Sequence, residues 1–291
     1  MQPSLKLPKS VVGVMQWGQW GANFSTSEMI SFIQKAVEHQ LTCFDHADIY
    51  GGHTIEEAFG NAFSKSGISR DQVQLITKAG IKYPTEKFPY SIKHYDYGCE
   101  YLIQVVDRAL KNLQTDYIDV FLLHRPSPLM QAEEVVKAME QLMVQGKILQ
   151  FGVSNFTLTQ MALIQKYIPI YYNQLEISLT HDNALTDGIL DYLQTFDIQP
   201  MAWSPLGTYF KGNNMQNDRI KKVINELTNK YEVTEDVLLL AWLHQHPSRI
   251  IPVLGTTKWE RILNQSKASN LTLELEEWFA LWVASRGEKV P

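Results

Sequence analysis

Residues 117–124 read YIDVFLLH, an apolar run interrupted by a single aspartate. Near-continuous apolar strands of this kind are typical of parallel sheets, in which both faces of the strand are covered. Seven further runs follow the same pattern. Six lie at 11–17, 73–80, 148–155, 171–178, 199–207 and 249–256, and another leads into FDHAD at 44–48. Each of the eight is followed by at least one stretch with apolar residues at helical spacing, so the pattern predicts alternating strands and helices.

Eight strand-and-helix units in 291 residues indicate a (β/α)8 TIM barrel, an α/β fold. An open, doubly wound sheet is the competing arrangement. It is weakened because no GxGxxG motif follows the first run. No Pro/Gly/Ser-rich linker, internal repeat or change of composition divides the chain. We therefore expect a single domain over residues 1–291.

The composition is ordinary for a globular chain, with 45% hydrophobic residues, 20% charged residues and a formal net charge of −5. Mild acidity without a basic stretch argues against a nucleic-acid or anionic-membrane partner. The two cysteines, Cys43 and Cys99, form no CxxC pair, so we expect neither a zinc ribbon nor a disulfide framework. The N-terminus lacks the apolar core of a signal peptide, and no apolar run approaches the ~18 residues that span a membrane. These features predict a cytoplasmic monomer or small homo-oligomer.

The second run continues into FDHADIYGG, residues 44–52, which places two carboxylates, a histidine and a tyrosine within a few positions. Ordinary strand-end residues, a metal site and an acid/base site are all open interpretations. A metal site would use His46, Asp48 and His53, but their spacing matches no zinc or non-haem iron pattern. We therefore expect no metal. Alternation along the strand points His46 away from Asp45, and we assign Asp48 to packing or helix capping.

The carboxyl ends of the predicted strands are unusually polar. In a (β/α)8 barrel these ends meet at one rim, which carries the active site. A lone His124 would more often be a structural residue, and Lys78 could be a solvated strand-end lysine. Polar ends on seven of the eight strands, all at one rim, nevertheless indicate a functional site. The residues at these ends are Asp45 to Tyr50, Lys78, His124, Ser154, Asn155, Asn173, Gln174, Glu176, Trp203, Ser204, Gly255, Thr256 and Thr257.

Seven segments follow one another in order along residues 11–270: FDHADIYG, LITKAG, DYIDVFLLHRP, GKILQFGVSNF, NQLEIS, AWSPLG and IPVLGTTKWERI. Together they resemble the successive signatures of the aldo-keto reductase superfamily. Within it, the chain is most similar to the bacterial oxidoreductases with an HRP motif after the fourth strand. The resemblance implies a (β/α)8 barrel that reduces a small-molecule carbonyl substrate with a nicotinamide cofactor, NADPH, which becomes NADP.

By motif position, the resemblance places a catalytic tetrad on Asp45, Tyr50, Lys78 and His124. Hydride delivery to a carbonyl carbon leaves an alkoxide, which Tyr50 would protonate. The ordinary tyrosine pKa of about 10 makes it a reluctant acid near neutral pH. An ammonium at ~4 Å attracts the phenolate by about 4 kcal/mol before desolvation losses, so Lys78 is expected to lower that pKa. Asp45 would hold Lys78 charged, and His124 would orient the substrate carbonyl.

The resemblance also implies the residues that bind the cofactor. Ser154, Asn155 and Gln174 would hydrogen-bond the nicotinamide carboxamide, and Trp203 would stack on the ring. Thr257-x-x-Glu260 is also a capping box, so Thr257 has a purely structural alternative. A helix N-terminus with added cations is a ready phosphate site. The remaining implied contacts are Ser204 and Leu206 along the pyrophosphate, Gly255, Thr257, Lys258 and Arg261 at the phosphates, and Asn264 and Gln265 at the adenine.

Loops form the substrate pocket and vary most. Its expected walls are apolar or aromatic: Trp17, Trp20, Ile81, Tyr83 and Tyr209. The first alternative function is an NADPH-binding regulatory subunit with little turnover, as some proteins on this scaffold are. The second is a barrel aldolase or isomerase that uses Lys78 as a Schiff-base amine.

Overall fold

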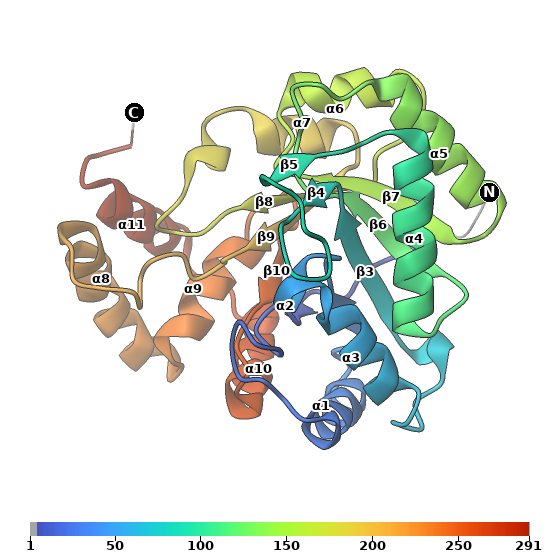
Figure 1. Ribbon diagram of the computed structural model, residues 1–291. Helices are drawn as coiled ribbons and strands as arrows, with labels where there is room; N and C mark the ends of the chain where they lie inside the picture. The colour runs from blue at the N-terminus through green and yellow to red at the C-terminus, as the bar shows by residue number, and fades with distance from the viewer. Residues whose placement is uncertain (1–4, 291) are drawn as a thin grey trace. The chain divides into compact units, whose positions relative to one another are not determined.

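A computed structural model describes residues 5–290 and places one strand in each of the eight predicted runs. These strands are β1 (Val11–Gly13), β2 (Cys43–Asp45), β3 (Gln74–Ala79), β6 (Ile118–Leu123), β7 (Ile148–Ser154), β8 (Tyr172–Glu176), β9 (Gln199–Trp203) and β10 (Ile251–Leu254). They form a closed barrel in the order β1-β10-β9-β8-β7-β6-β3-β2 (Figure 1). The pairs β1–β2, β2–β3, β3–β6, β6–β7, β7–β8 and β9–β10 are parallel. The predicted (β/α)8 barrel is therefore confirmed.

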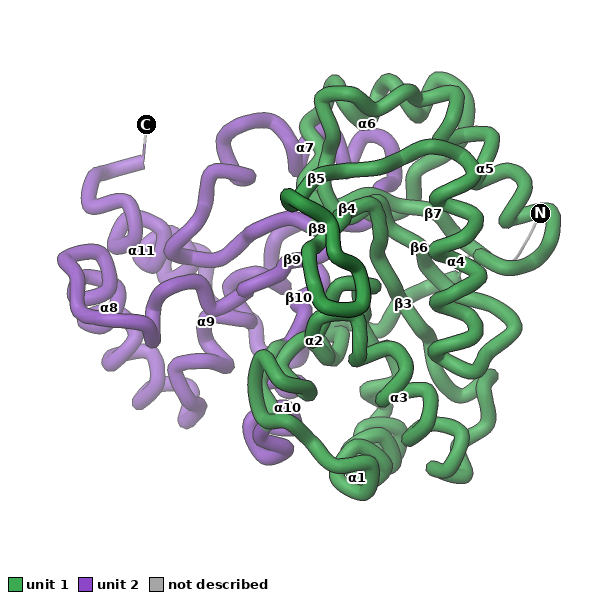
Figure 2. The backbone as a smooth tube through the Cα atoms, in the orientation of Figure 1, with its two compact units in different colours: residues 1–174, 255–257 green, residues 175–254, 258–291 purple. Residues whose placement is uncertain are grey.

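Contacts between Cα atoms divide the chain into two compact units (Figure 2). The first unit comprises residues 1–174 and 255–257, and the second comprises residues 175–254 and 258–291. The first unit holds β1 to β7 and most of β8, whereas β9 and β10 belong to the second. A single domain over the whole chain stays a prediction.

In the first unit, helices that succeed one another along the chain also pack against one another. They are α1 (Thr26–Glu38), α2 (Tyr50–His53), α3 (Ile55–Phe63), α4 (Cys99–Leu113), α5 (Ala132–Val144) and α6 (Leu158–Gln165), with a 3-10 turn η1 (Arg70–Gln72). Contacts join α1 to α3, α3 to α4, α4 to α5 and α5 to α6. The apolar face of α4 is inside, since Leu102, Val106 and Leu113 are fully buried. Helices that pack in chain order in this way are typical of the outer layer of a (β/α)8 barrel. Figure 1 shows α3 and α4 of this layer near β3.

The segment 81–97 is rich in Tyr and Pro, and it contains a short hairpin. Its strands β4 (Ile81–Lys82) and β5 (His94–Tyr95) pair antiparallel. Strands of two residues carry no readable alternation, and the Tyr- and Pro-rich sequence between them is typical of a loop. The hairpin was missed for this reason.

Besides β9 and β10, the second unit contains five helices. They are α7 (Ile189–Thr195), α8 (Met215–Tyr231), α9 (Glu235–His244), α10 (Trp259–Ser266) and α11 (Leu275–Arg286), with 3-10 turns η2 (Asn183–Leu185) and η3 (Lys267–Asn270). Trp242 and Trp278 stack with centroids 4.9 Å apart, and the indole N–H of each donates to the backbone carbonyl of the other. Among residues 5–290, no helix is both long and apolar enough to cross a membrane.

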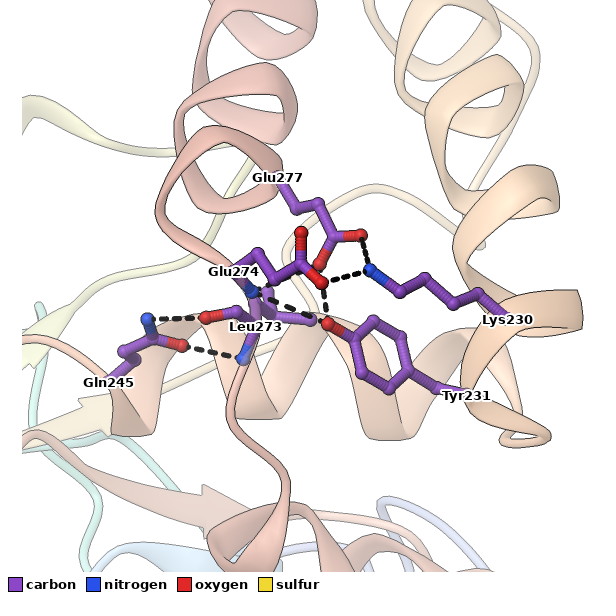
Figure 3. Close-up of polar contacts among 6 residues, drawn as sticks. All are labelled: Lys230, Tyr231, Gln245, Leu273, Glu274 and Glu277. Carbon is purple, nitrogen blue, oxygen red and sulfur yellow. Dashed lines mark hydrogen bonds and ion pairs between the residues drawn. The ribbon is translucent and has the colours of Figure 1, made fainter.

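Polar contacts fix the start of α11 within the second unit (Figure 3). Lys230 Nζ lies 2.6 Å from a carboxylate oxygen of Glu274 and 2.6 Å from one of Glu277. The Gln245 side chain both donates to the Leu273 carbonyl and accepts from the Leu273 N–H, each at 2.9 Å. The start of α11 is thereby tied to the carboxyl-terminal ends of α8 and α9.

Candidate active site

A buried ion pair lies at the carboxyl ends of β2 and β3. Lys78 Nζ is 2.7 Å from each carboxylate oxygen of Asp45 and donates to the His46 carbonyl at 2.9 Å. Lys78 is 1% exposed and Asp45 3% exposed. Gln174 Nε2, from the end of β8, donates to Asp45 Oδ1 at 3.0 Å. The parallel pairing of β2 with β3 places Asp45 and Lys78 at the same edge of the sheet, and both charges are satisfied there.

Tyr50 lies over this ion pair. Lys78 Nζ is 5.1 Å from the centroid of its ring, and the ring of His124 lies 6.1 Å from that of Tyr50 at an angle of 81°. Gly51 and Gly52 have φ of +57° and +66°, which glycine adopts readily, so the chain turns sharply directly after Tyr50. The structure thus brings all four predicted tetrad residues together within the first unit.

Burial decides the acidity of Tyr50. It raises the pKa of the Tyr50 hydroxyl above its ordinary value, and the Lys78 ammonium, which hydrogen-bonds to it, counteracts only part of that effect. Lys78 does lower the pKa, as predicted, but the net shift is upward because desolvation of the phenolate outweighs its attraction to Lys78. Burial alone would lower the pKa of Lys78, but Asp45 and Tyr50 raise it above its usual range. Lys78 is consequently an ammonium at neutral pH.

His124 is a buried, neutral histidine. Burial, reinforced by the positive charges of Lys78 and Arg125, holds its pKa well below the ordinary value. Its backbone N–H donates to the Ala79 carbonyl at 2.8 Å, which ties the end of β6 to β3. The ring Nδ1 is buried, and no hydrogen-bond partner for it exists among residues 5–290. A neutral imidazole carries one N–H donor and one acceptor.

The polar residues at the ends of β7 and β8 form a connected group. Ser154 Oγ donates to the Gln174 carbonyl at 2.9 Å, and Asn155 Nδ2 donates to Ser154 Oγ at 2.7 Å. Asn155 has φ of +61°, a left-handed conformation that asparagine tolerates better than most residues. Through Gln174, this group is joined to Asp45. The link between the catalytic and the amide residues was not predicted.

The other predicted cofactor residues lie around β9, β10 and α10. Gly255 and Thr257 belong to the first unit, and the rest to the second. Trp203 and Ser204 are half-buried at the end of β9, and Leu206 follows two residues later. The N-cap of α10 is Lys258, so the alternative role of Thr257 as the cap of this helix was wrong. Lys258 and Arg261 are exposed.

The two proposed adenine contacts are engaged within the second unit. Asn264 Nδ2 donates to Thr234 Oγ1 at 2.7 Å, and Gln265 Nε2 donates to Asp236 Oδ2 at 2.9 Å. Gln265 is 4% exposed. These bonds hold α10 against the start of α9, so both amides are fixed in position.

Of the predicted pocket walls, Trp20 and Tyr83 are half-buried beside Tyr50, whereas Trp17, Ile81 and Tyr209 are almost fully buried. The Trp20 ring lies 6.4 Å from that of Tyr50 and 5.9 Å from that of Tyr83, both edge-on. Trp17 instead is fully buried in an aromatic cluster, and its placement supports packing and not a pocket wall. Ile81 and Tyr209 are 2% and 1% exposed, respectively. The partners of Trp17 are Phe24, Phe32, Phe44 and Phe59.

The residues of the rejected metal site separate in the structure. The His46 side chain points away from Asp45, as predicted, with its ring 4.4 Å from that of Phe59, and burial lowers its pKa to about 3. Asp48 faces Arg108 at 3.5 Å, and His53 Nε2 donates to the Tyr83 carbonyl at 3.2 Å. In the described part of the chain, no group of three or more His, Cys, Asp or Glu side chains is placed to hold a metal ion.

Comparison with known proteins agrees with this geometry. The chain is 36% identical to uncharacterized oxidoreductase YcsN of Bacillus subtilis, over 99% of this chain and 97% of that protein. It is 34% identical to 6-dehydroglucose reductase of Agrobacterium fabrum, over 100% of this chain and 98% of that protein. The crystal structure of an aldo/keto reductase from Klebsiella pneumoniae in complex with NADP and acetate matches with a TM-score of 0.77 and 26% identity, over 94% of this chain and 90% of that one. The aldo/keto reductase family model matches residues 10–282. The chain therefore belongs to the aldo/keto reductase family of oxidoreductases, whose cofactor is NADP(H).

Proposed function

We propose that this chain reduces aldehydes and ketones to alcohols with NADPH, and that Tyr50 is the general acid. The observation that carries the proposal is the buried ion pair beneath Tyr50. Lys78 holds both oxygens of Asp45 at 2.7 Å, and its Nζ lies 5.1 Å from the Tyr50 ring. A fixed ammonium beside a buried tyrosine stabilises the phenolate that remains after proton donation.

The raised pKa of Tyr50 suits an acid in the reductive direction. The hydroxyl stays protonated at neutral pH, so nearly every molecule carries the proton that the alkoxide needs. A high pKa would by itself make the transfer slow, and the Lys78 ammonium offsets this as negative charge develops on the Tyr50 oxygen. The raised pKa of Tyr50 and the strong effect of the Lys78 charge on it both follow from the burial of these two side chains.

Asp45 and Gln174 act through Lys78. An ammonium buried to 1% exposure would lose its proton without a counter-charge, and the Asp45 carboxylate prevents this. Gln174 satisfies a further lone pair of Asp45 at 3.0 Å. Their role is to keep one positive charge in a fixed place below the Tyr50 hydroxyl.

His124 is proposed to hydrogen-bond the substrate carbonyl. Because its imidazole is neutral, it offers one N–H to the carbonyl oxygen without competing with Tyr50 as the acid. Its ring lies 6.1 Å from that of Tyr50, so a carbonyl oxygen between the two side chains could accept from both. This arrangement polarises the carbonyl and fixes its orientation.

The amide group at the ends of β7 and β8 suits the carboxamide of a nicotinamide. A carboxamide needs both a donor and an acceptor, and Ser154, Asn155 and Gln174 supply hydroxyl and amide groups of both kinds. Asn155 donates to Ser154 at 2.7 Å, and Ser154 donates to the Gln174 backbone carbonyl at 2.9 Å. The Gln174 side chain is held separately by Asp45 at 3.0 Å, so all three groups are fixed in advance. When bound, NADPH supplies the hydride that adds to the carbonyl carbon. We assign the carboxamide to these three residues.

In the second unit, we assign Trp203 to the nicotinamide ring, Ser204 and Leu206 to the pyrophosphate, and Asn264 and Gln265 to the adenine. Gly255 and Thr257 precede α10, and the exposed Lys258 and Arg261 bring two cations to its first turn. Their charges favour the 2′-phosphate that distinguishes NADPH from NADH. Lys258→Ala and Arg261→Ala should each weaken NADPH binding more than NADH binding, and equal weakening of both would refute the assignment.

The first experiment is a fluorescence titration with NADPH and NADH, followed by a turnover screen of aldehydes, ketones and quinones. The half-buried aromatic residues Trp20 and Tyr83 beside Tyr50 favour a small substrate with an apolar or aromatic face. Glucose oxidised to the aldehyde at carbon 6 belongs in the screen, because relatives 34% and 29% identical are named 6-dehydroglucose reductase. NADPH-dependent loss of a carbonyl substrate supports the proposal. Tight NADPH binding without turnover of any compound would favour a regulatory subunit.

A Schiff-base role for Lys78 conflicts with its surroundings. Schiff-base chemistry requires a neutral amine, whereas three oxygen acceptors within 2.9 Å and a raised pKa keep Lys78 protonated. Borohydride treatment in the presence of substrate should therefore trap no adduct on Lys78.

A further inference from the structure

Tyr97 lies where the β4–β5 hairpin returns to the barrel. It follows β5 by two residues, precedes Gly98, the N-cap of α4, and is 5% exposed. The backbone N–H of its neighbour Asp96 donates to the Gly80 carbonyl at 3.0 Å. The hairpin is thus anchored to the chain that leaves β3, two residues after Lys78.

The Tyr97 ring packs directly against the backbone of Gly80. A Cβ atom at position 80 would lie 1.9 Å from Tyr97 Cε1 and 2.3 Å from Cζ, and Gly80 has φ of +113°. Both the space and the backbone conformation therefore require glycine at this position. The ring is held against the end of β3 with no gap.

The Tyr97 hydroxyl hydrogen-bonds both backbone groups of Arg125, the residue after His124. It donates to the Arg125 carbonyl and accepts from the Arg125 N–H at 3.1 Å. Pro126 follows, which restricts the Arg125 backbone to extended conformations. One side chain thus links the end of β3, which carries Lys78, to the end of β6, which carries His124.

The side chain of His124 needs such support from the backbone. Its Nδ1 is buried without a hydrogen-bond partner in residues 5–290, so no side chain sets the ring orientation through that atom. The position of the His124 ring therefore depends on its backbone. The His124 N–H is held by the Ala79 carbonyl, and the next residue, Arg125, is held by the Tyr97 hydroxyl. Loss of the Tyr97 hydroxyl would release one of these two supports.

We propose that Tyr97 is a positioning residue for carbonyl reduction, which it serves by fixing the main chain beside His124. The proposal rests on the proposed function of His124 as the hydrogen-bond donor to the substrate carbonyl. Tyr97 does not touch the reacting atoms. It acts by preventing the end of β6 from moving relative to Lys78, and a displacement of ~1 Å at such a site can lower a rate by about 100-fold.

The test is Tyr97→Phe, which keeps the ring on Gly80 and removes only the hydroxyl. We expect kcat/KM for the best carbonyl substrate to fall by about 10- to 100-fold, while the Kd for NADPH changes less than about twofold. The matched control is Tyr172→Phe. Tyr172 is the first residue of β8 and is 4% exposed. Its hydroxyl donates to Gln150 Oε1 at 2.9 Å. The control should lose similar stability but keep its kcat/KM, and equal kcat/KM in the two variants would overturn the proposal.

A double-mutant cycle with His124→Ala shows whether Tyr97 acts through His124. In the His124→Ala background, Tyr97→Phe should change kcat/KM by less than about twofold. An undiminished loss in that background would show that Tyr97 acts elsewhere and would overturn the proposal. Carbonyl reduction by the wild-type protein is measured first. Its absence would refute the proposed function, and this result is distinct from a failure of the Tyr97 proposal.

Hydrogen exchange of the Arg125 amide needs no turnover. The amide should exchange slowly in the wild type and in Tyr172→Phe, and at least about tenfold faster in Tyr97→Phe. If Tyr97→Phe does not fold, the exchange rate of the Arg125 amide in the wild-type protein still tests the proposal. Slow exchange supports the hydrogen bond to Tyr97, and unprotected exchange overturns the proposal.

Discussion

Replacing Lys78 by methionine should destabilise the protein as well as inactivate it. The substitution keeps most of the side-chain volume but removes the ammonium that lies 2.7 Å from both oxygens of Asp45. Asp45, 3% exposed, would then be a buried carboxylate without a counter-charge. Removing one partner of a buried ion pair costs about 3–5 kcal/mol. Gln174 still donates to Asp45, so we expect the lower end, about 3 kcal/mol.

The assay is urea unfolding at neutral pH, with the midpoint compared at unchanged slope. Lys147→Met is the control, because Lys147 Nζ lies 2.6 Å from Asp107 Oδ1 in a pair whose side chains are 31% and 46% exposed. An exposed pair contributes less than about 1 kcal/mol. Both pairs thus have a short N–O distance, but the Lys78 pair is buried and bidentate, whereas the Lys147 pair is exposed and joined through one carboxylate oxygen.

The double variant Asp45→Leu/Lys78→Met separates the ion pair from simple packing. Removing both charges relieves the unpaired carboxylate, so the double variant should be more stable than the sum of the two single losses predicts, by at least about 1 kcal/mol. Additive losses, or a Lys78→Met variant as stable as Lys147→Met, would refute the reasoning.

Three further predictions follow from backbone and burial. Gly51→Ala should cost about 1–2 kcal/mol and slow carbonyl reduction, because φ is +57° and a Cβ would lie 2.9 Å from Ile55 Cγ1. Gly67→Ala, with φ of +75° and nothing within 4 Å of its Cβ, should cost only the backbone strain and leave turnover unchanged. Because burial raises the pKa of Tyr50, reductive kcat should stay level from about pH 6 to about pH 9, and a decline centred below pH 8 would contradict this. Folding lowers the pKa of His46 from 6.5 to about 3, so the stability it contributes is complete above pH 6.5 and is lost as pH falls toward 3. His46→Leu should flatten this acid limb of a stability–pH curve by at most about 1.4 kcal/mol per pH unit, and an unchanged slope would count against a neutral His46.

The strands could be predicted because each is an apolar run buried on both faces. YIDVFLLH contains β6 in full. The polar residues near the ends of β2, β3 and β6, namely Asp45, Lys78 and His124, do lie close to Tyr50 in the first unit. The hairpin of β4 and β5 could not be predicted, because its strands have two residues each. Short pairing of this kind depends on the surface beneath it, here Gly80 and the chain beyond β3.

The burial of individual side chains at the site could not be predicted from the sequence. Motif positions placed Lys78 beside Tyr50 correctly, but whether the ammonium or desolvation dominates the pKa of Tyr50 depends on the surrounding structure. Trp17 shows the same limit, since an aromatic residue after a strand fits either a pocket or a core until its neighbours are known. The hydrogen bond from Gln174 to Asp45 spans 129 positions and joins β8 to β2, which are not neighbours in the barrel, so the sequence gives no local signal for it.

Tyr50→Phe tests the central claim most directly. The hydroxyl is the proposed source of the proton, whereas the ring contributes contacts with Trp20 and His124 that phenylalanine retains. We predict that NADPH titrates the variant with a Kd within about twofold of the wild type, while kcat on the best carbonyl substrate falls by on the order of 100-fold or more. A variant that binds NADPH and reduces the same carbonyl at the wild-type rate would contradict the account.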